Sequence, residues 1–490
     1  AERTAAGCTA LVADPSLVRV LVTGPDFVHA PAVRRSTPAT SGDPDPAPPV
    51  ESVASGTAPI EAGPAVAADG GVATAGAAKG PATPTVTPDD SRAGEVAWVS
   101  WDHPRMPWDG TVLERGVLRW GPDGPESIDD REVVAGGEAE SVVQPGFLAD
   151  GTLLFCTDRT GWWNPWRQAA PGAPVEPVLA DGGVEAEIGG PMWVGGLRWW
   201  AEIAPGRLAV SARADGADGL GVIEADGSLH RLPTPFTDLR SQVVAGPGDG
   251  DGDERPVLVV AGSPAAEPAP YLLRVLDVAE DELGPADTAG GDRGEAVFTV
   301  AAERLRPGRD LGIGPEWISR PRHVTFPTGP DGKAVAHALV YPPTNPTVRP
   351  PAGERPPLVV MIHGGPTSNA RQVLELGKQF WTSRGFCVAD VDHRGSTGYG
   401  RPFRDLLQGA WGLVDVEDAV AAARFLAEQE EVDGDRLAIR GGSAGGFTTL
   451  AALCFHDAFA AGASHYGVAD LAALAAETHK FESRYLDGLV

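Results

Sequence analysis

A serine flanked by glycines is the pattern in this sequence with the clearest chemistry. Gly441-Gly442-Ser443-Ala444-Gly445 fits G-x-S-x-G, and it follows the strand-like run RLAI and precedes the helix-like run FTTLAALCF. Between a strand and a helix this pattern is a nucleophile elbow, a strained turn that presents the serine hydroxyl at the end of a sheet. The pattern alone is also found in ordinary glycine-rich turns, so the strand before it and the helix after it are what favour a nucleophile elbow. We predict that Ser443 is a catalytic nucleophile.

Acyl transfer at a serine also needs hydrogen-bond donors for the oxyanion that develops on the substrate carbonyl. The backbone N–H of Ala444, directly after the serine, supplies one donor by geometry. A glycine-rich loop after an earlier strand supplies the second, and His363-Gly364-Gly365-Pro366 follows the apolar run PPLVVMI in this way. We predict the N–H of Gly365 as the second donor and interpret His363 as a structural loop histidine.

The elements around these residues alternate between strands and helices. The runs PPLVVMI, FCVADVD and RLAI are strand-like, whereas RQVLELGKQFWTSRG, with a stop at Gly385, and DVEDAVAAARFLAEQE have helical patterns. Such alternation is typical of βαβ units on a doubly wound, mostly parallel sheet. We therefore predict an α/β domain over residues 313–490, after a boundary near Pro307 to Pro321.

The preceding part of the chain has short β-like runs and tight turns instead. Runs rich in apolar and β-branched residues begin near Val96, Leu153, Leu208 and Val257, about 50 residues apart, a period typical of propeller blades. About four or five such units are visible, fewer than in many closed propellers. We predict a β-propeller domain over residues 1–312, with an all-β sandwich as the structural alternative.

Composition excludes several other classes of protein. Residues 36–95 are rich in Ala, Pro, Gly, Thr and Asp, which indicates a low-complexity insertion with little apolar surface to bury. The net charge of -28 repels nucleic acid and anionic membranes, so neither is an expected partner. No apolar run reaches about 18 residues and the start of the chain does not resemble a signal peptide, so we expect a cytoplasmic protein.

Cofactor and metal sites are not indicated either. The four cysteines lie far apart without a C-x-x-C pair, which argues against a disulfide framework and a zinc site, so we read them as free thiols. The glycines of GSTGYG, residues 395–400, lack the lysine of a phosphate-binding loop and the spacing of a dinucleotide fingerprint. We interpret this segment as a turn at the sheet edge and predict no cofactor and no metal.

Several motifs together resemble the prolyl oligopeptidase family of serine peptidases, in its acylaminoacyl-peptidase-like and dipeptidyl-aminopeptidase-like branch. They are MIHGGP, HRGSTGYGR, WGLVDVEDAVAAARFLAEQ, RLAIRGGSAGGFTTLAAL and the final THKFESRYLDGLV, with WDHPRMPWDG and TDRTGWWN nearer the start. The resemblance covers Val96 to Val490. It implies an N-terminal β-propeller that caps an α/β-hydrolase domain, and cleavage of short peptides that reach the serine through the propeller or its side. Residues 36–95 depart from the family pattern.

In α/β-hydrolases the catalytic triad runs from serine to an acid and then to a histidine after the last strand. Asp470 follows the strand-like run AAGASHYG, but His479 comes too soon after it for another strand. His456 and His465 precede Asp470 and break the order. We therefore expect the sequence to be truncated at its C-terminus, with the acid and the histidine beyond its last residue. The small number of predicted blades leads us to expect a truncation at the N-terminus as well. On its own this 490-residue chain is expected to be nearly inactive.

The leading hypothesis is a serine peptidase that hydrolyses short peptides through an acyl-enzyme on Ser443. A carboxylesterase shares this chemistry, and a non-catalytic propeller that binds partners beside a vestigial hydrolase fragment is the alternative from another class. Glu185 and Glu187 are two positions apart in GGVEAEIGG, so both carboxylates would lie on one face of a strand and could bind a free peptide amine. Because the chain has 67 acidic residues, we favour the interpretation that the two form part of a solvated face. The exopeptidase or endopeptidase specificity and the oligomeric state, including a homo-oligomer, stay open.

Overall fold

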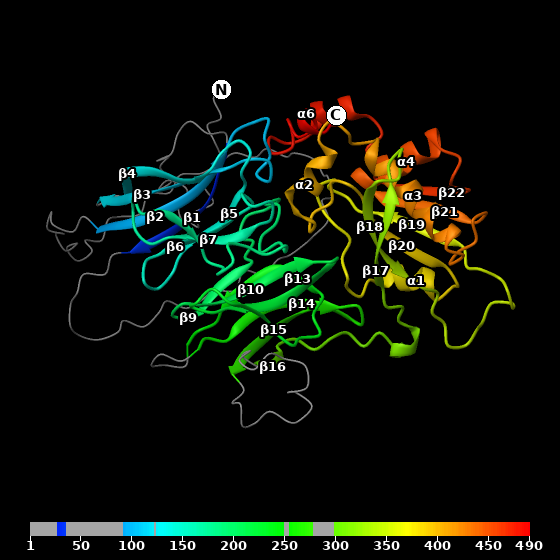
Figure 1. Cartoon of the computed structure of the whole chain (residues 1–490), viewed down its shortest axis with the longest axis horizontal. Coiled ribbons are helices and arrows are strands. Elements are labelled where there is room, and N and C mark those ends of the chain that lie inside the picture. The colour runs from blue at the N-terminus through cyan, green and yellow to red at the C-terminus, as the bar shows by residue number, and fades with distance from the viewer. Residues whose placement is uncertain (1–26, 36–91, 122–123, 249–253, 278–297) are drawn as a thin grey trace, which may run out of the picture.

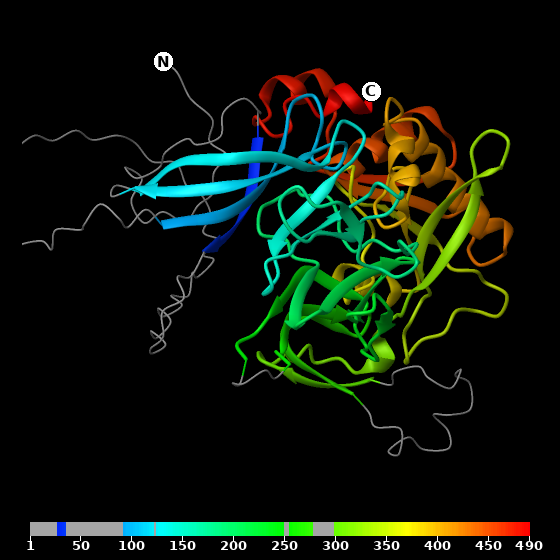
Figure 2. The same cartoon turned by 60° about the vertical axis from the view of Figure 1, so that its left-hand side comes forward.

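The computed structural model describes residues 27–35, 92–121, 124–248, 254–277 and 298–490. These residues form two parts that lie side by side in both views (Figures 1 and 2). We call the sheets up to Arg304 the antiparallel part, and the sheet and helices from Pro315 onward the α/β part. Residues 36–91 of the predicted low-complexity segment lie outside the described residues.

The antiparallel part consists of four four-stranded sheets, each formed by four strands consecutive in the chain. The first contains β1 (Phe27–Arg35), β2 (Arg92–Trp101), β3 (Val112–Gly121) and β4 (Gly124–Gly136), and the second contains β5 (Val142–Phe147), β6 (Leu153–Thr157), β7 (Asn164–Gln168) and β8 (Val175–Pro177). The third contains β9 (Trp200–Ala204), β10 (Arg207–Ala214), β11 (Ala217–Ile223) and β12 (Leu229–Arg231), and the fourth β13 (Asp238–Ala245), β14 (Val257–Ser263), β15 (Ala266–Asp277) and β16 (Phe298–Arg304). A β-sandwich consists of two packed sheets, so these four separate sheets do not agree with the all-β sandwich that the sequence left as an alternative.

The turn between β5 and β6 shows how the local sequence shapes these sheets. Gly151 has a φ of +95°, a conformation that glycine adopts at no steric cost. The N–H of Leu148 donates to the carbonyl of Thr152 at 2.9 Å and closes the hairpin. All five residues of β6 are buried, which agrees with a run LLFCT that is apolar up to its last residue, Thr157. A tight turn and a strand that begins at Leu153 are present as predicted.

The first sheet contains a strand that local patterns do not reveal. β1 pairs antiparallel with β2, with Arg35 opposite Gly94, although residues 36–91 separate them in the sequence. The predicted low-complexity segment extends to residue 95, but β2 already begins at Arg92. Pairing with β1 on one side and β3 on the other extends β2 beyond its run of apolar residues, so the strand overlaps the end of that segment.

The α/β part contains one six-stranded sheet in the order β17-β18-β20-β19-β21-β22. Its strands are β17 (Arg322–Thr328), β18 (Ala334–Tyr341), β19 (Leu358–Ile362), β20 (Cys387–Asp392), β21 (Leu437–Gly442) and β22 (Ala461–His465), of which the last four are parallel. The helices are η3 (Pro315–Trp317), α1 (Leu376–Thr382), α2 (Gly400–Arg404), η4 (Asp405–Leu407), α3 (Val414–Glu428), α4 (Ala444–Phe455), α5 (Leu471–Glu477) and α6 (Leu486–Leu489). Because β19 and β21 are parallel neighbours, their carboxyl ends meet at one edge of the sheet.

The two parts share a buried core. One hydrophobic cluster contains Trp108 and Trp163 from the antiparallel part together with Leu407, Trp411 and Tyr485 from the α/β part. In both views α6 lies beside the antiparallel part (Figures 1 and 2). Among the residues that the structure describes, no helix combines the length and the apolar character needed to cross a membrane.

Candidate active site

Ser443 occupies the turn between β21 and α4 in a strained backbone conformation. Its φ of 54° and ψ of -120° are uncommon for a residue other than glycine. The carbonyl of Ser443 accepts hydrogen bonds from the N–H groups of Gly446 at 3.0 Å and Phe447 at 3.2 Å, and its own N–H donates to the carbonyl of His465 at 3.1 Å. These bonds hold the turn while Ser443 itself is exposed. The structure therefore contains the strand, sharp turn and helix predicted around the serine.

The glycines around the serine are required by close backbone contacts. A Cβ at Gly441 would lie 2.1 Å from the carbonyl oxygen of Gly445, and a Cβ at Gly445 would lie 2.3 Å from the carbonyl oxygen of Ile362. Because Ile362 ends β19, the second contact places α4 directly against the end of the neighbouring strand. Ser443 therefore lies where β19, β21 and α4 meet.

The glycine-rich loop after β19, residues 363–366, passes beside Ser443. A Cβ built on Gly364 would lie 3.7 Å from the Cβ of Ser443. Gly365 has a φ of +126°, which favours glycine. Ala444 is buried and begins α4, so its N–H is one of the four that a helix leaves without an internal partner. The predicted elements are thus adjacent, and the roles of Gly365 and Ala444 as oxyanion donors stay predictions.

His363 is bound to the rest of the protein through both ring nitrogens. Nδ1 donates to the carbonyl of Gly364 at 2.8 Å, which leaves Nε2 to accept from Oγ of Ser396 at 2.8 Å. The ring stacks on His393 with the centroids 4.7 Å apart. Burial, with His393 beside it, lowers the pKa of His363 to about 3, so the ring is neutral near pH 7. These contacts agree with a structural loop histidine.

The acid and histidine candidates after Ser443 have other contacts in the structure. Asp470 is the N-cap of α5, where its carboxylate accepts two backbone N–H groups of the first turn. His479 has a side chain 68% exposed, and its Nε2 lies 3.9 Å from the carboxylate of Glu482. Neither contact is to Ser443. That the triad acid and histidine follow the last residue of this sequence stays a prediction.

Glu187 has an environment that the sequence did not reveal. Glu185 is exposed, but Glu187 is 3% exposed and lies at an isolated β-bridge. Its carboxylate accepts hydrogen bonds from the N–H of Trp163 at 2.8 Å and of Gly400 at 3.1 Å. Burial raises the pKa of Glu187 to about 7. The assignment of Glu187 to a solvated face is wrong, because Gly400, from the α/β part, covers it.

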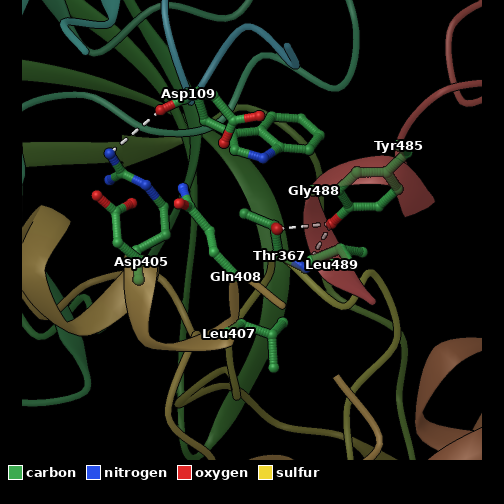
Figure 3. A pocket seen from close by; sticks show the side chains of 10 residues that line it. Asp109, Thr367, Asp405, Leu407, Gln408, Tyr485, Gly488 and Leu489 are labelled. Carbon is green, nitrogen blue, oxygen red and sulfur yellow. Dashed lines mark hydrogen bonds between the residues drawn. The ribbon is translucent and has the colours of Figure 1, made fainter. Parts of the chain in front are cut away.

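A small cavity lies beside the glycine-rich loop, where the two parts meet (Figure 3). Its walls include Trp108 of the antiparallel part, Thr367 directly after the glycine-rich loop, and Tyr485 directly before α6. The cavity volume of about 40 Å³ has room for a few water molecules and not for a peptide side chain. In the described ranges, no group of three or more His, Cys, Asp or Glu side chains is placed to hold a metal ion.

Comparison with known proteins gives consistent matches. Residues 373–490 match the prolyl oligopeptidase family. The dipeptidyl aminopeptidase BIII of Pseudoxanthomonas mexicana is 34% identical over 134 residues, which are 27% of this chain and 19% of that protein. A puromycin hydrolase structure is 39% identical with a TM-score of 0.68, over 82% of this chain and 55% of its own. A puromycin-hydrolyzing peptidase of Mycobacterium tuberculosis is 38% identical with a TM-score of 0.68, over 81% of this chain and 54% of that structure. The chain therefore spans about half of the two solved structures and a smaller share of the curated relative.

Proposed function

Residues 373–490 belong to the prolyl oligopeptidase family, and from this premise we propose that the protein is a serine peptidase that cleaves short peptides. The hydroxyl of Ser443 attacks the carbonyl carbon while the N–H groups of Gly365 and Ala444 bind the oxyanion. The C–N bond then breaks, and the amine takes the proton that the serine gives up and leaves, so that an acyl-enzyme remains. Water hydrolyses this ester, which releases the acid product and restores the serine hydroxyl. The observation that carries the proposal is the strained turn at Ser443 beside the glycine-rich loop. In this proposal residues 1–312 form a β-propeller and residues 313–490 an α/β-hydrolase domain.

The relatives favour substrates in which an amino acid is held in an amide bond. The similarity to puromycin hydrolase extends over 82% of the chain at 39% identity, so it includes both the antiparallel part and the α/β part. The proposed substrate class is therefore a short peptide or another aminoacyl amide.

The direct test is the Ser443→Ala variant made in the full-length protein, which is the parent in all the measurements below. A fluorophosphonate probe should label the parent protein and not this variant, and the kcat for a peptide nitroanilide should fall on the order of 10⁶-fold, because the nucleophile is absent. Ser383→Ala is the matched control, since the hydroxyl of Ser383 donates to the carbonyl of Phe380 in α1. The control should label and hydrolyse like the parent.

Each alternative makes a different prediction in this test. If Ser443→Ala labels as fast as the parent, another serine is the nucleophile. If the parent hydrolyses esters at a Ser443-dependent rate but neither peptides nor aminoacyl amides, the protein is a carboxylesterase. If the full-length parent is neither labelled nor active on any of these substrates, the non-catalytic binding module is the better description.

A further inference from the structure

We propose that Tyr485 and Trp193 are positioning residues that act through Thr367. They hold in place the glycine-rich loop of residues 363–366, which we call the oxyanion loop because Gly365 is a proposed oxyanion donor. The inference rests on the proposed function, because it assigns a role within the same site. Thr367 follows Gly365 by two positions and is 4% exposed. Its N–H, its carbonyl and its hydroxyl each have a side-chain partner from a distant part of the chain.

Two side chains hold Thr367 from different parts of the protein. The N–H of Thr367 donates to the phenol oxygen of Tyr485 at 3.1 Å, and Oγ1 of Thr367 lies 2.6 Å from the same oxygen (Figure 3). The carbonyl of Thr367 accepts a hydrogen bond from Nε1 of Trp193 at 2.8 Å. Trp193 lies between β8 and β9 in the antiparallel part. Because leaving a buried backbone group unpaired is unfavourable, these bonds restrict where Thr367 can lie.

The position of Thr367 in turn determines that of Gly365. A Cβ at Gly365 would lie 2.7 Å from the nitrogen of Thr367 and 3.1 Å from its carbonyl carbon, so the two residues form a tight bend. Any displacement of Thr367 therefore displaces Gly365, whose N–H is the proposed oxyanion donor. A misplacement of about 1 Å in an active site is enough to reduce a rate by about 100-fold.

An aromatic cluster keeps the two positioning side chains together. Trp108 packs against Trp193 with ring centroids 4.5 Å apart and against Tyr485 at 5.5 Å, and Trp193 and Tyr485 are 5.6 Å apart. The last two contacts are edge-to-face, a favourable arrangement of aromatic rings. Burial raises the pKa of Tyr485, so its hydroxyl keeps the proton that it can donate to Oγ1 of Thr367. The oxyanion loop is thus coupled to the packing of the antiparallel part.

The test removes single polar atoms from these side chains. Tyr485→Phe removes the phenol oxygen and keeps the ring, and Trp193→Phe removes the indole N–H. In both variants the kcat for a peptide nitroanilide should fall about 10- to 100-fold, with KM within about twofold of the parent value. Fluorophosphonate labelling of Ser443 should slow by a similar factor.

Matched controls make the same chemical changes elsewhere. Trp166→Phe removes an indole nitrogen that has no hydrogen-bond partner in the described part of the chain. Tyr271→Phe changes a tyrosine in β15 whose ring packs against Phe236. Both controls should keep kcat and KM within about twofold of the parent. Amide hydrogen exchange of residues 363–370 should be faster in Tyr485→Phe than in the parent or in the controls, a change that loss of global stability alone does not confine to this loop.

The outcomes separate this proposal from the function on which it rests. A labelled, active parent whose Tyr485→Phe and Trp193→Phe variants keep their kcat and their exchange rates overturns the positioning role alone. A lower melting temperature with unchanged kcat overturns it as well, because it reports a purely structural contribution. A parent without Ser443-dependent labelling or hydrolysis overturns the proposed function and this inference together.

Discussion

The carboxylate of Asp158, in the turn after β6, lies 2.6 Å from Nη2 of Arg404 in α2, and this buried ion pair joins the two parts of the chain. Nε of Arg401 donates to the same carboxylate oxygen at 2.8 Å, and the N–H of Ser141 donates to the other at 2.7 Å. The Asp158 side chain is 0% exposed. Asp158 therefore couples the second antiparallel sheet to the segment that follows the glycines of 395–400.

We expect Asp158→Asn to destabilise the protein by about 3–5 kcal/mol, because it leaves the buried guanidinium of Arg404 without its counter-ion and leaves Arg401 paired with Asp405 alone. Denaturant unfolding of parent and variant measures this loss. Glu354→Gln is the control, since Glu354 pairs with Arg436 at 3.1 Å and both side chains are about two-fifths exposed (43% and 42%). An exposed pair contributes less than about 1 kcal/mol, so equal losses in the two variants would contradict the proposed importance of the buried pair.

Gly445→Ala should impair both stability and the reaction of Ser443. The new Cβ would lie 2.3 Å from the carbonyl oxygen of Ile362 and 2.6 Å from that of His363, and backbone atoms cannot move aside easily. We expect a loss of about 1–3 kcal/mol in unfolding free energy and fluorophosphonate labelling slowed about 10-fold or more. Gly377→Ala in α1, where a Cβ would meet nothing within 4 Å, should instead stabilise the protein by about 0.5–1 kcal/mol. Equal unfolding free energies and equal labelling rates in the two variants would show that the close contact at Gly445 affects neither stability nor the reaction of Ser443.

Glu187 should make stability depend on pH in a defined direction. Its pKa is raised to about 7, whereas an unfolded glutamate has a pKa of about 4.3. Between these values the folded protein holds a proton that the unfolded chain releases, so the contribution of Glu187 to stability is greatest below about pH 4 and falls as the pH rises to about 7. The glutamine in Glu187→Gln does not titrate. The melting temperature of this variant relative to the parent should therefore rise from pH 5 to pH 8.

The control for this measurement is Glu185→Gln, because Glu185 is exposed. Its melting temperature relative to the parent should stay constant over the same pH range. A constant difference for Glu187→Gln as well would mean that Glu187 is already ionised in the folded protein at pH 5.

His363→Gln should lower the rate of Ser443 labelling without moving its pH midpoint. The pKa of His363 is lowered to about 3, so the ring stays neutral from pH 5 to pH 8 and adds no ionisation to the profile. Loss of the hydrogen bonds to Gly364 and Ser396 should reduce the labelling rate about 10-fold. Labelling rates of parent and variant across this range test the prediction, and a midpoint shifted by about one pH unit would identify His363 as a group that titrates with the reaction.

Local residue patterns determined the elements that form the candidate site. The run RLAI is apolar enough to be a buried strand, FTTLAALCF has helix-forming residues, and the glycines between them permit the turn at Ser443. The glycines of HGGP likewise predicted a glycine-rich loop after a strand, and in that loop Gly365 has a φ of +126°. These features depend on neighbours in the chain, so the sequence contains the information needed to predict them.

Other parts of the fold and site were decided only by contacts between distant residues. Strand β1 is defined by its pairing with β2 across residues 36–91, and Glu187 is buried because Gly400, 213 positions later, covers it. Thr367 is held by Tyr485 and Trp193, which are 118 and 174 positions away in the chain. A hydrophobic pattern indicates which face of an element is buried, but it does not identify the partner on the other side. Those partners follow from how the two parts pack, and therefore only the tertiary structure revealed them.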